Sequence, residues 1–342
     1  MSERDDWLAL TREQVIEPGL PICDPHHHLW NHPGSRYLVE EFLADIDGGK
    51  AGAACAGHRV TSTVFVECLQ FYRPDGPEEM KPVGETEFID GVAGDYETSN
   101  GTVDVAAAIV GFADLTLGRE VQAVLEAHLA ASKRFCGIRY ATAWDASERI
   151  HNAHTQPRPG LMQDAKFRAG LACLEPLGLS FDAWLYHPQL AELVELAQDF
   201  PGLTIVLDHM AGPLGIGPYA EKREAVFDAW RHALEPLARC ANVNIKLGGR
   251  SLTMAGFGWH RREAPPGSSE LAEAFGPYYR ACIDLFGAER CMFESNFPVD
   301  RASCSYTVLW NAFKKLSANY SPQQRAALFH DTASRVYRLN GR

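Results

Sequence analysis

Several features that this sequence lacks narrow the kind of protein it encodes. Its nine cysteines are spread singly from Cys23 to Cys304 and include no C-x-x-C pair. Such scatter disfavours a disulfide framework or a structural zinc site and favours reduced thiols. No apolar run reaches the roughly 20 residues that cross a bilayer, and the charged first residues lack the apolar stretch of a signal peptide. We therefore expect a cytoplasmic protein with no membrane partner.

An excess of basic charge is also lacking. The net charge of −12 argues against nucleic acid as a partner. The 342 residues are 46% hydrophobic and 22% charged, an ordinary globular balance that provides a large core. Because no repeat or linker interrupts the chain, we expect a single domain over 1–342 with its core at about 20–339. The sequence leaves a homo-oligomer open.

Short β-rich runs alternate with helical patterns along the chain. Apolar residues recur at helical spacing near 190–197 and 226–237. Eight units of a strand followed by a helix predict an α/β fold, a single (β/α)8 TIM barrel, with a doubly wound open sheet as the rival. No G-x-G-x-x-G follows an early strand, which disfavours the dinucleotide-binding version of that rival. The eight runs lie at 20–23, 60–67, 103–112, 135–141, 179–186, 203–208, 242–247 and 290–295.

Long segments separate several strands from their following helices. In a barrel these βα loops lie at the C-terminal face, where active sites are built. A closing C-terminal helix is expected from Ser321-Pro322, an N-cap followed by proline, to near Leu339. The long loops are 29–58, 68–84, 142–163, 210–220 and 248–268.

The run Asp24-Pro25-His26-His27-His28 ends the first predicted strand. Alternate residues of a strand share a face, so Asp24, His26 and His28 are expected to point the same way. Two imidazoles at this spacing can bind a divalent metal or polarise a substrate carbonyl. His187 and His209 end the fifth and sixth predicted strands. A barrel would bring all four histidines to one rim.

These motifs together give the chain a family resemblance. It resembles the amidohydrolase superfamily, and within it amidohydrolase-related family 2, over about residues 20–339. The branch that it resembles includes 2-pyrone-4,6-dicarboxylate lactonase and sugar-acid lactonases. The resemblance implies the barrel and catalysis at its C-terminal face, but the superfamily also hosts decarboxylases and C–N hydrolases. The matching motifs are Asp24-x-His26-x-His28, Gly137-Ile138-Arg139, Tyr186-His187-Pro188, Leu207-Asp208-His209 and Phe293-Glu294-Ser295-Asn296-Phe297-Pro298.

Asn296 departs from the family pattern, which has aspartate at the end of the eighth strand. The superfamily uses that aspartate as metal ligand and as general base, and an amide has no useful basicity near neutral pH. Asn296 can still orient a water or a carbonyl. The replacement base stays open among Glu294, Glu67, an unligated histidine and a water acidified by a metal.

The sequence leaves the metal open as well. Loss of the aspartate weakens a divalent site, and the lactonase that the chain resembles is a metal-free member. The fourth strand offers Arg139 and no lysine, so the binuclear centre of the superfamily is not expected. The alternatives are no cofactor or one divalent metal, with zinc favoured because it tolerates imidazole ligands. In the mononuclear case the ligands would be His26, His28 and His187.

Cationic and aromatic residues at the same rim indicate the substrate. Arg139 and Lys246 lie inside strands, and Arg73 follows the second strand. Such groups would hold an anionic cyclic substrate, unless Arg139 and Lys246 instead neutralise Glu67, Glu294 or Asp208. The predicted substrate-binding residues are Arg139, Lys246, Arg73, Glu67, His151 and Trp144.

We therefore predict a hydrolase that opens a small cyclic ester (lactone) or a related carboxylate-bearing ring by attack of water. Its predicted catalytic residues are His26, His28, His187, His209, Glu294 and Asn296. A metal-dependent non-oxidative decarboxylase of aromatic or enol acids is the first alternative. The second alternative is a barrel that only binds a ligand.

Overall fold

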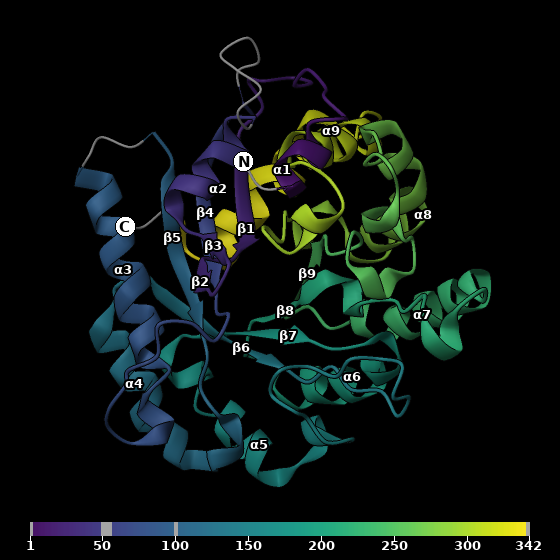
Figure 1. The fold of residues 1–342 in the computed structure, drawn as a ribbon. Helices are drawn as coiled ribbons and strands as arrows, with labels where there is room; N and C mark the ends of the chain where they lie inside the picture. Colours follow the sequence, from purple (N-terminus) through teal and green to yellow (C-terminus); the bar gives the residue numbers. More distant parts are fainter. Residues whose placement is uncertain (1–2, 49–56, 99–101, 340–342) are drawn as a thin grey trace.

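The structure is a computed structural model and describes residues 3–48, 57–98 and 102–339. Eight parallel strands form one sheet in the order β1-β4-β5-β6-β7-β8-β9-β10. They curve around a common centre with helices outside them (Figure 1). The strands are β1 (Ile22–His27), β4 (Val60–Val66), β5 (Asp104–Gly111), β6 (Phe135–Ala141), β7 (Ser180–Trp184), β8 (Ile205–Leu207), β9 (Val243–Leu247) and β10 (Cys291–Phe293).

The sheet closes between its first strand and the segment that follows β10. His27 forms a parallel bridge with Phe297. The His28 amide donates to the Phe297 carbonyl at 2.8 Å, and the Asn296 amide donates to the His26 carbonyl at 2.9 Å. The predicted (β/α)8 barrel is therefore confirmed, and the open-sheet rival is excluded.

Eleven α-helices are assigned within the described ranges, mostly around the strands (Figure 1). Both predicted amphipathic patterns are helices, α6 and α7. None of the helices in the described ranges has the length and apolar character of a membrane span. The helices are α1 (Glu3–Leu8), α2 (Val39–Ile46), α3 (Val83–Thr98), α4 (Gln122–Ala131), α5 (Ala165–Leu171), α6 (Leu190–Asp199), α7 (Arg223–Ala238), α8 (Ser268–Phe286), α9 (Tyr306–Leu316), α10 (Pro322–Ala326) and α11 (Thr332–Val336).

The loops also contain regular structure. A short antiparallel hairpin, β2 (Trp30–His32) with β3 (Ser35–Tyr37), follows β1. The predicted closing helix begins as expected at the Ser321 cap. It is not one α-helix, because a π-helical turn at Ala327–Asp331 separates α10 from α11. Part of the loop predicted at 29–58 lies outside the described residues.

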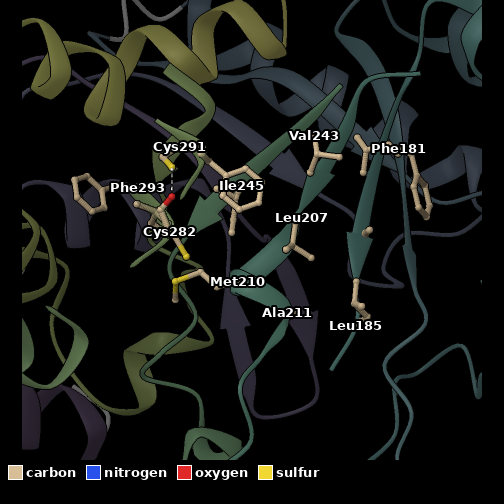
Figure 2. Packing of buried hydrophobic residues seen from close by; sticks show 14 of the residues in the cluster. Phe181, Leu185, Leu207, Met210, Ala211, Val243, Ile245, Cys282, Cys291 and Phe293 are labelled. Atoms are coloured by element: carbon tan, nitrogen blue, oxygen red, sulfur yellow. Dashed lines mark hydrogen bonds between the residues drawn. The ribbon is translucent and has the colours of Figure 1, made fainter. Parts of the chain in front are cut away.

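Alternation along the strands sorts apolar side chains into two layers. Figure 2 shows the outer layer, where Leu207, Val243, Ile245 and Phe293 pack with residues of the surrounding helices. A second cluster contains Cys23, Val64, Val66, Ala108, Val110, Cys136, Val206, Met292 and residues of the α11 segment. The predicted outward direction of Val243, Ile245 and Leu247 is thus confirmed, and Lys246, between Ile245 and Leu247, faces inward.

The prediction that Asp24 shares a face with His26 and His28 is wrong. The pairing of β1 with β4 shifts register between Asp24 and His27, as a β-bulge does when it inserts one extra residue. The Asp24 carboxylate accepts hydrogen bonds from the Ser295 amide at 2.9 Å and the Tyr306 hydroxyl at 3.0 Å. Asp24 therefore ties β1 to the segment after β10 and to α9, while His26 faces the barrel interior.

Candidate active site

The Glu294 carboxylate joins two of the predicted histidines. His209 donates from Nδ1 to Glu294 Oε1 at 2.6 Å, and His26 Nδ1 lies 2.9 Å from Glu294 Oε2. The imidazole centroids of His26 and His209 are 4.6 Å apart. These side chains come from the ends of β10, β8 and β1, so the convergence expected of a barrel rim is present.

Local backbone geometry brings His209 and Glu294 together. His209 has a φ of 52°, in the left-handed region, and begins a run of three such residues. That conformation is unfavourable for a residue with a Cβ and has to be held by its surroundings. After β9, the chain passes so close that a Cβ on Gly248 would lie 2.1 Å from Glu294 Cγ, and one on Gly249 would lie 2.6 Å from His209 Cγ. Two glycines therefore leave the space that the pair occupies.

Lys246 lies fully buried beneath this group. Its ammonium is 2.7 Å from Asp182 Oδ2 and 3.0 Å from Asp208 Oδ1, and it lies 3.2 Å from His26 Nδ1. Burial opposes the charged lysine, but these carboxylates and Glu294 raise its pKa. Lys246 therefore pairs with Asp208, one of the acids that it was expected to neutralise, and its role in binding substrate stays a prediction.

The same group has the chemistry of a cation site. One donor atom from each of His26, His209 and Glu294 lies within 4.8 Å of the other two, and two imidazoles with one carboxylate suit zinc. His26 Nε2 is buried and has no hydrogen-bond partner among the described residues. The single ammonium of Lys246 faces the carboxylates of Asp182, Asp208 and Glu294, so the buried cluster has an excess of negative charge. These residues fit a divalent cation.

A second ion pair lies beside the first cluster. Arg139 donates from Nε to Glu67 Oε1 at 2.7 Å, and His154 Nε2 is 3.4 Å from the same oxygen. His28 connects the two groups, because its ring lies edge-on to His26 with centroids 4.9 Å apart. His28 donates from Nδ1 to the Val66 carbonyl at 2.8 Å. That bond leaves His28 Nε2 as a hydrogen-bond acceptor.

Burial keeps His26 and His28 neutral. Burial and the Arg139 charge lower the pKa of His28 to about 3, and burial and Lys246 lower the pKa of His26 well below its usual range. Burial alone would raise the pKa of Glu294, but His209 and His26 lower it to about 2. Glu294 is therefore an ionised anchor at neutral pH and a poor general base.

His187 and Arg73 make their contacts with residues outside this cluster. The His187 ring accepts a hydrogen bond at Nδ1 from the Leu214 amide at 3.4 Å and lies edge-on to Tyr219. The structure thus gathers His26, His209 and Glu294 rather than the predicted ligand set of His26, His28 and His187. Arg73 forms an ion pair with Glu87 on α3 at the surface, and its expected role at the substrate stays a prediction.

The loop after β6 carries two other predicted residues, His151 and Trp144. His151 and His154 line a surface hollow together with neighbouring residues of the same loop. Because His154 also contacts Glu67, this hollow adjoins the Arg139 ion pair. Trp144, earlier in the loop, is partly buried and donates its backbone amide to Gln189.

Three residues of the site were missed by the sequence prediction. Asp182 pairs with Lys246 and accepts a hydrogen bond from Tyr337 at 2.7 Å, and Asp300 accepts one from the Asn296 amide at 3.3 Å. Asp182 left a signal, since an acid between Phe181 and Ala183 in a predicted strand has to face inward. The position of Tyr337 depends on the closing helices and that of Asp300 on a short 3-10 turn before α9, and neither gave a comparable signal.

With this geometry established, comparison with known proteins identifies the family. The amidohydrolase family model matches residues 23–339, so the chain belongs to the amidohydrolase family and is an enzyme of the hydrolase class. An uncharacterised protein of Sinorhizobium fredii is 32% identical over 94% of this chain and 99% of its own length. L-fucono-1,5-lactonase of Burkholderia ambifaria is 29% identical over 79% of this chain and 87% of its own.

A solved structure supports the fold in the same way. An amidohydrolase from Burkholderia multivorans with bound zinc superimposes with a TM-score of 0.68 over 93% of this chain and 99% of its own, at 23% identity. At this identity the likeness establishes the barrel architecture. The lactonase relatives support lactone hydrolysis as the general activity.

Replacing Gly248 with alanine should disrupt the site. The added Cβ would overlap Glu294 Cγ at 2.1 Å, so we expect a loss of about 1–3 kcal/mol of stability and displacement of the carboxylate from His209. Gly91→Ala in α3 is the control, because nothing lies within 4 Å of its Cβ and alanine should stabilise that helix by about 0.5–1 kcal/mol. Urea unfolding and activity are measured for both. Wild-type behaviour of Gly248→Ala would contradict the packing described.

Replacing Glu67 with glutamine should destabilise the protein in a pH-dependent way. Burial opposes ionisation, yet Arg139 and His154 lower the Glu67 pKa from 4.5 to about 2. Its stabilising contribution is therefore complete above pH 4.5 and is lost as the pH falls toward 2. At pH 7 the variant leaves Arg139 buried without its charge partner and should lose about 3 kcal/mol.

The matched control for this prediction is Glu87→Gln, which breaks the surface pair with Arg73 and should cost no more than about 1 kcal/mol. Unfolding free energies of the wild type and both variants are compared from pH 7 to pH 3. A constant gap between wild type and Glu67→Gln over this range would refute the proposed ionisation.

Proposed function

We propose that this protein hydrolyses a small lactone by attack of water at the C-terminal face of its barrel. The observation that carries the proposal is the convergence of His26, His209 and Glu294 from three strand ends. The names of two relatives as L-fucono-1,5-lactonases support the reaction class.

Each side chain of the site would have its own role in this reaction. Glu294 accepts the proton of His209 Nδ1, which fixes that ring and leaves its Nε2 as an acceptor. His28 is held in the same tautomer by Val66. The imidazoles would orient the ester carbonyl and the water, and the ion pairs of Lys246 and Arg139 would hold the surrounding strands rigid. Preorganised groups of this kind lower the barrier because they need not reorganise during the reaction.

We further propose that one divalent cation, zinc, is bound by His26, His209 and Glu294. The buried negative charge around Lys246 and the unpartnered His26 Nε2 support this assignment. When bound, such an ion lowers the pKa of a coordinated water and polarises a carbonyl. Its presence would also remove the need for a strong protein base at the position of Asn296.

The substrate in this proposal is a lactone whose ring carries hydroxyl groups rather than a carboxylate. The three cations that were predicted to bind an anion are already paired: Arg139 with Glu67, Lys246 with Asp182 and Asp208, and Arg73 with Glu87. A substrate carboxylate would also meet the negative excess of the buried cluster. Histidines and amides of the loop after β6 offer hydrogen bonds that suit hydroxyl groups instead.

A panel of lactones tests this proposal. We expect the purified protein to hydrolyse 1,4- and 1,5-lactones of sugar acids with kcat/KM at least tenfold above carboxylated lactones, measured by proton release. Glu294→Gln and His209→Ala should each lower kcat/KM by 100-fold or more, because both remove the anchor of the imidazole pair. The surface variant Glu87→Gln should remain within twofold of the wild type.

Other outcomes of the same panel would point elsewhere. Release of CO2 from an aromatic or enol acid would replace the lactonase proposal with the decarboxylase. Tight binding of a lactone without turnover, in folded protein supplied with zinc, would support a non-catalytic barrel. Retention of wild-type kcat/KM by Glu294→Gln would remove the proposed reaction centre.

A further inference from the structure

The replacement of the usual strand-end aspartate by Asn296 has a structural counterpart one helical turn later. Asn296 Nδ2 donates to Asp300 Oδ1 at 3.3 Å, and the Asp300 amide donates to the Asn296 carbonyl at 3.1 Å. Asn296 and Asp300 are 2% and 1% exposed, so water hardly competes for these bonds. A buried carboxylate therefore contacts the amide that follows the eighth strand.

Asn296 lies at the reaction centre described above. Its backbone amide donates to the His26 carbonyl, and it follows Glu294 by two residues. Its φ of 56° is in the left-handed region, which asparagine tolerates better than most residues. The backbone is therefore held in a conformation that fixes where the amide side chain begins.

An ionised carboxylate accepts hydrogen bonds and cannot donate them. Asp300 therefore selects one of the two orientations of the Asn296 amide, the one in which the NH2 group faces Asp300. The Asn296 Oδ1 atom then points away from Asp300 and is available as an acceptor. A protonated Asp300 would lose this selectivity, because its hydroxyl could donate to Oδ1 instead.

We propose that Asp300 is a positioning residue that orients the Asn296 amide, so that Asn296 Oδ1 accepts a hydrogen bond from the attacking water. The pair Asn296–Asp300 would thereby replace the orienting role of the aspartate found at this place in the family, without acting as a base. This inference rests on the proposed lactone hydrolysis for its catalytic part, and on the contact between the two side chains for its structural part.

The surroundings of Asp300 make its ionisation responsive to pH near neutrality. Burial raises its pKa to about 7, opposed by the neighbouring His209 and by hydrogen bonds from Asn296 and the Ser251 backbone. Glu294 raises it further. The other ionisable groups that interact electrostatically with Asp300 are Arg250, Tyr279 and Cys304. As the pH falls below about 7, the orientation of Asn296 should therefore be lost.

An exchange of the two residues separates this role from simple packing. Asp300→Ala should lower kcat at least tenfold with KM within threefold, and Asp300→Asn should retain more activity than Asp300→Ala because its oxygen can still accept from Asn296. Asn296→Asp alone places two carboxylates in contact and should also lower kcat tenfold. The double exchange Asn296→Asp with Asp300→Asn restores a donor facing an acceptor, and should recover at least fivefold over either single exchange.

The control substitution is Asp164→Asn at the N-cap of α5, far from the site in the sequence and on the surface; it should keep kcat within twofold. Full activity of Asp300→Ala, or a double exchange no more active than the single variants, would overturn the proposal. Variants are compared only after circular dichroism shows that each is folded.

A second measurement keeps the inference testable if no lactone is turned over. The side-chain NH2 signals of Asn296, assigned by their loss in Asn296→Asp, should shift with a midpoint near pH 7 in the wild type and not in Asp300→Asn. If the Asn296 NH2 signals titrate but no lactone is hydrolysed, the proposed function is wrong and the interaction between Asn296 and Asp300 is still supported. If these signals do not change with pH, or if they titrate equally in Asp300→Asn, the positioning role of Asp300 is refuted even in an active enzyme.

Discussion

The contact of one buried carboxylate with two imidazoles is the interaction on which the rest of the site depends. Glu294 can reach both His209 and His26 only if the ends of β8, β10 and β1 lie at matching heights around the barrel. The bulge in β1 turns His26 inward, and Gly248 and Gly249 leave room for the pair. A carboxylate in this environment would be costly without its partners. The folded barrel and the site therefore require each other.

Charge pairing divides the buried polar residues into two groups, those held in ion pairs and those left to act on a substrate. Lys246 with Asp182 and Asp208, and Arg139 with Glu67, are ion pairs in which each charge stabilises the other away from water. Such pairs contribute rigidity and specificity more than net stability. Because both buried cations are already paired, the proposed chemistry falls to the imidazoles, the Asn296 amide and the divalent cation that we propose. This division favours a hydroxylated substrate over an anionic one.

The sequence was sufficient to predict the barrel, because alternation of strands and helices leaves few other arrangements. It was also sufficient to predict that His26, His28 and His209 meet at one rim. His187 was expected there by the same reasoning; a 3-10 turn begins at His187 after that strand, and the His187 imidazole accepts a hydrogen bond from the Leu214 amide. The outward turn of Asp24 depends on a bulge that period-two alternation cannot foresee. Likewise, the π-helical turn before α11 left no signal that separates it from an ordinary helix.

The most direct test of this account is the position of zinc in a crystal of the protein, located by anomalous scattering at the zinc absorption edge. The account predicts one strong peak within bonding distance of His26, His209 and Glu294, beside the amide of Asn296. A peak coordinated by His28 and His187 without Glu294, or full lactonase activity in crystals whose barrel mouth contains no metal, would contradict it.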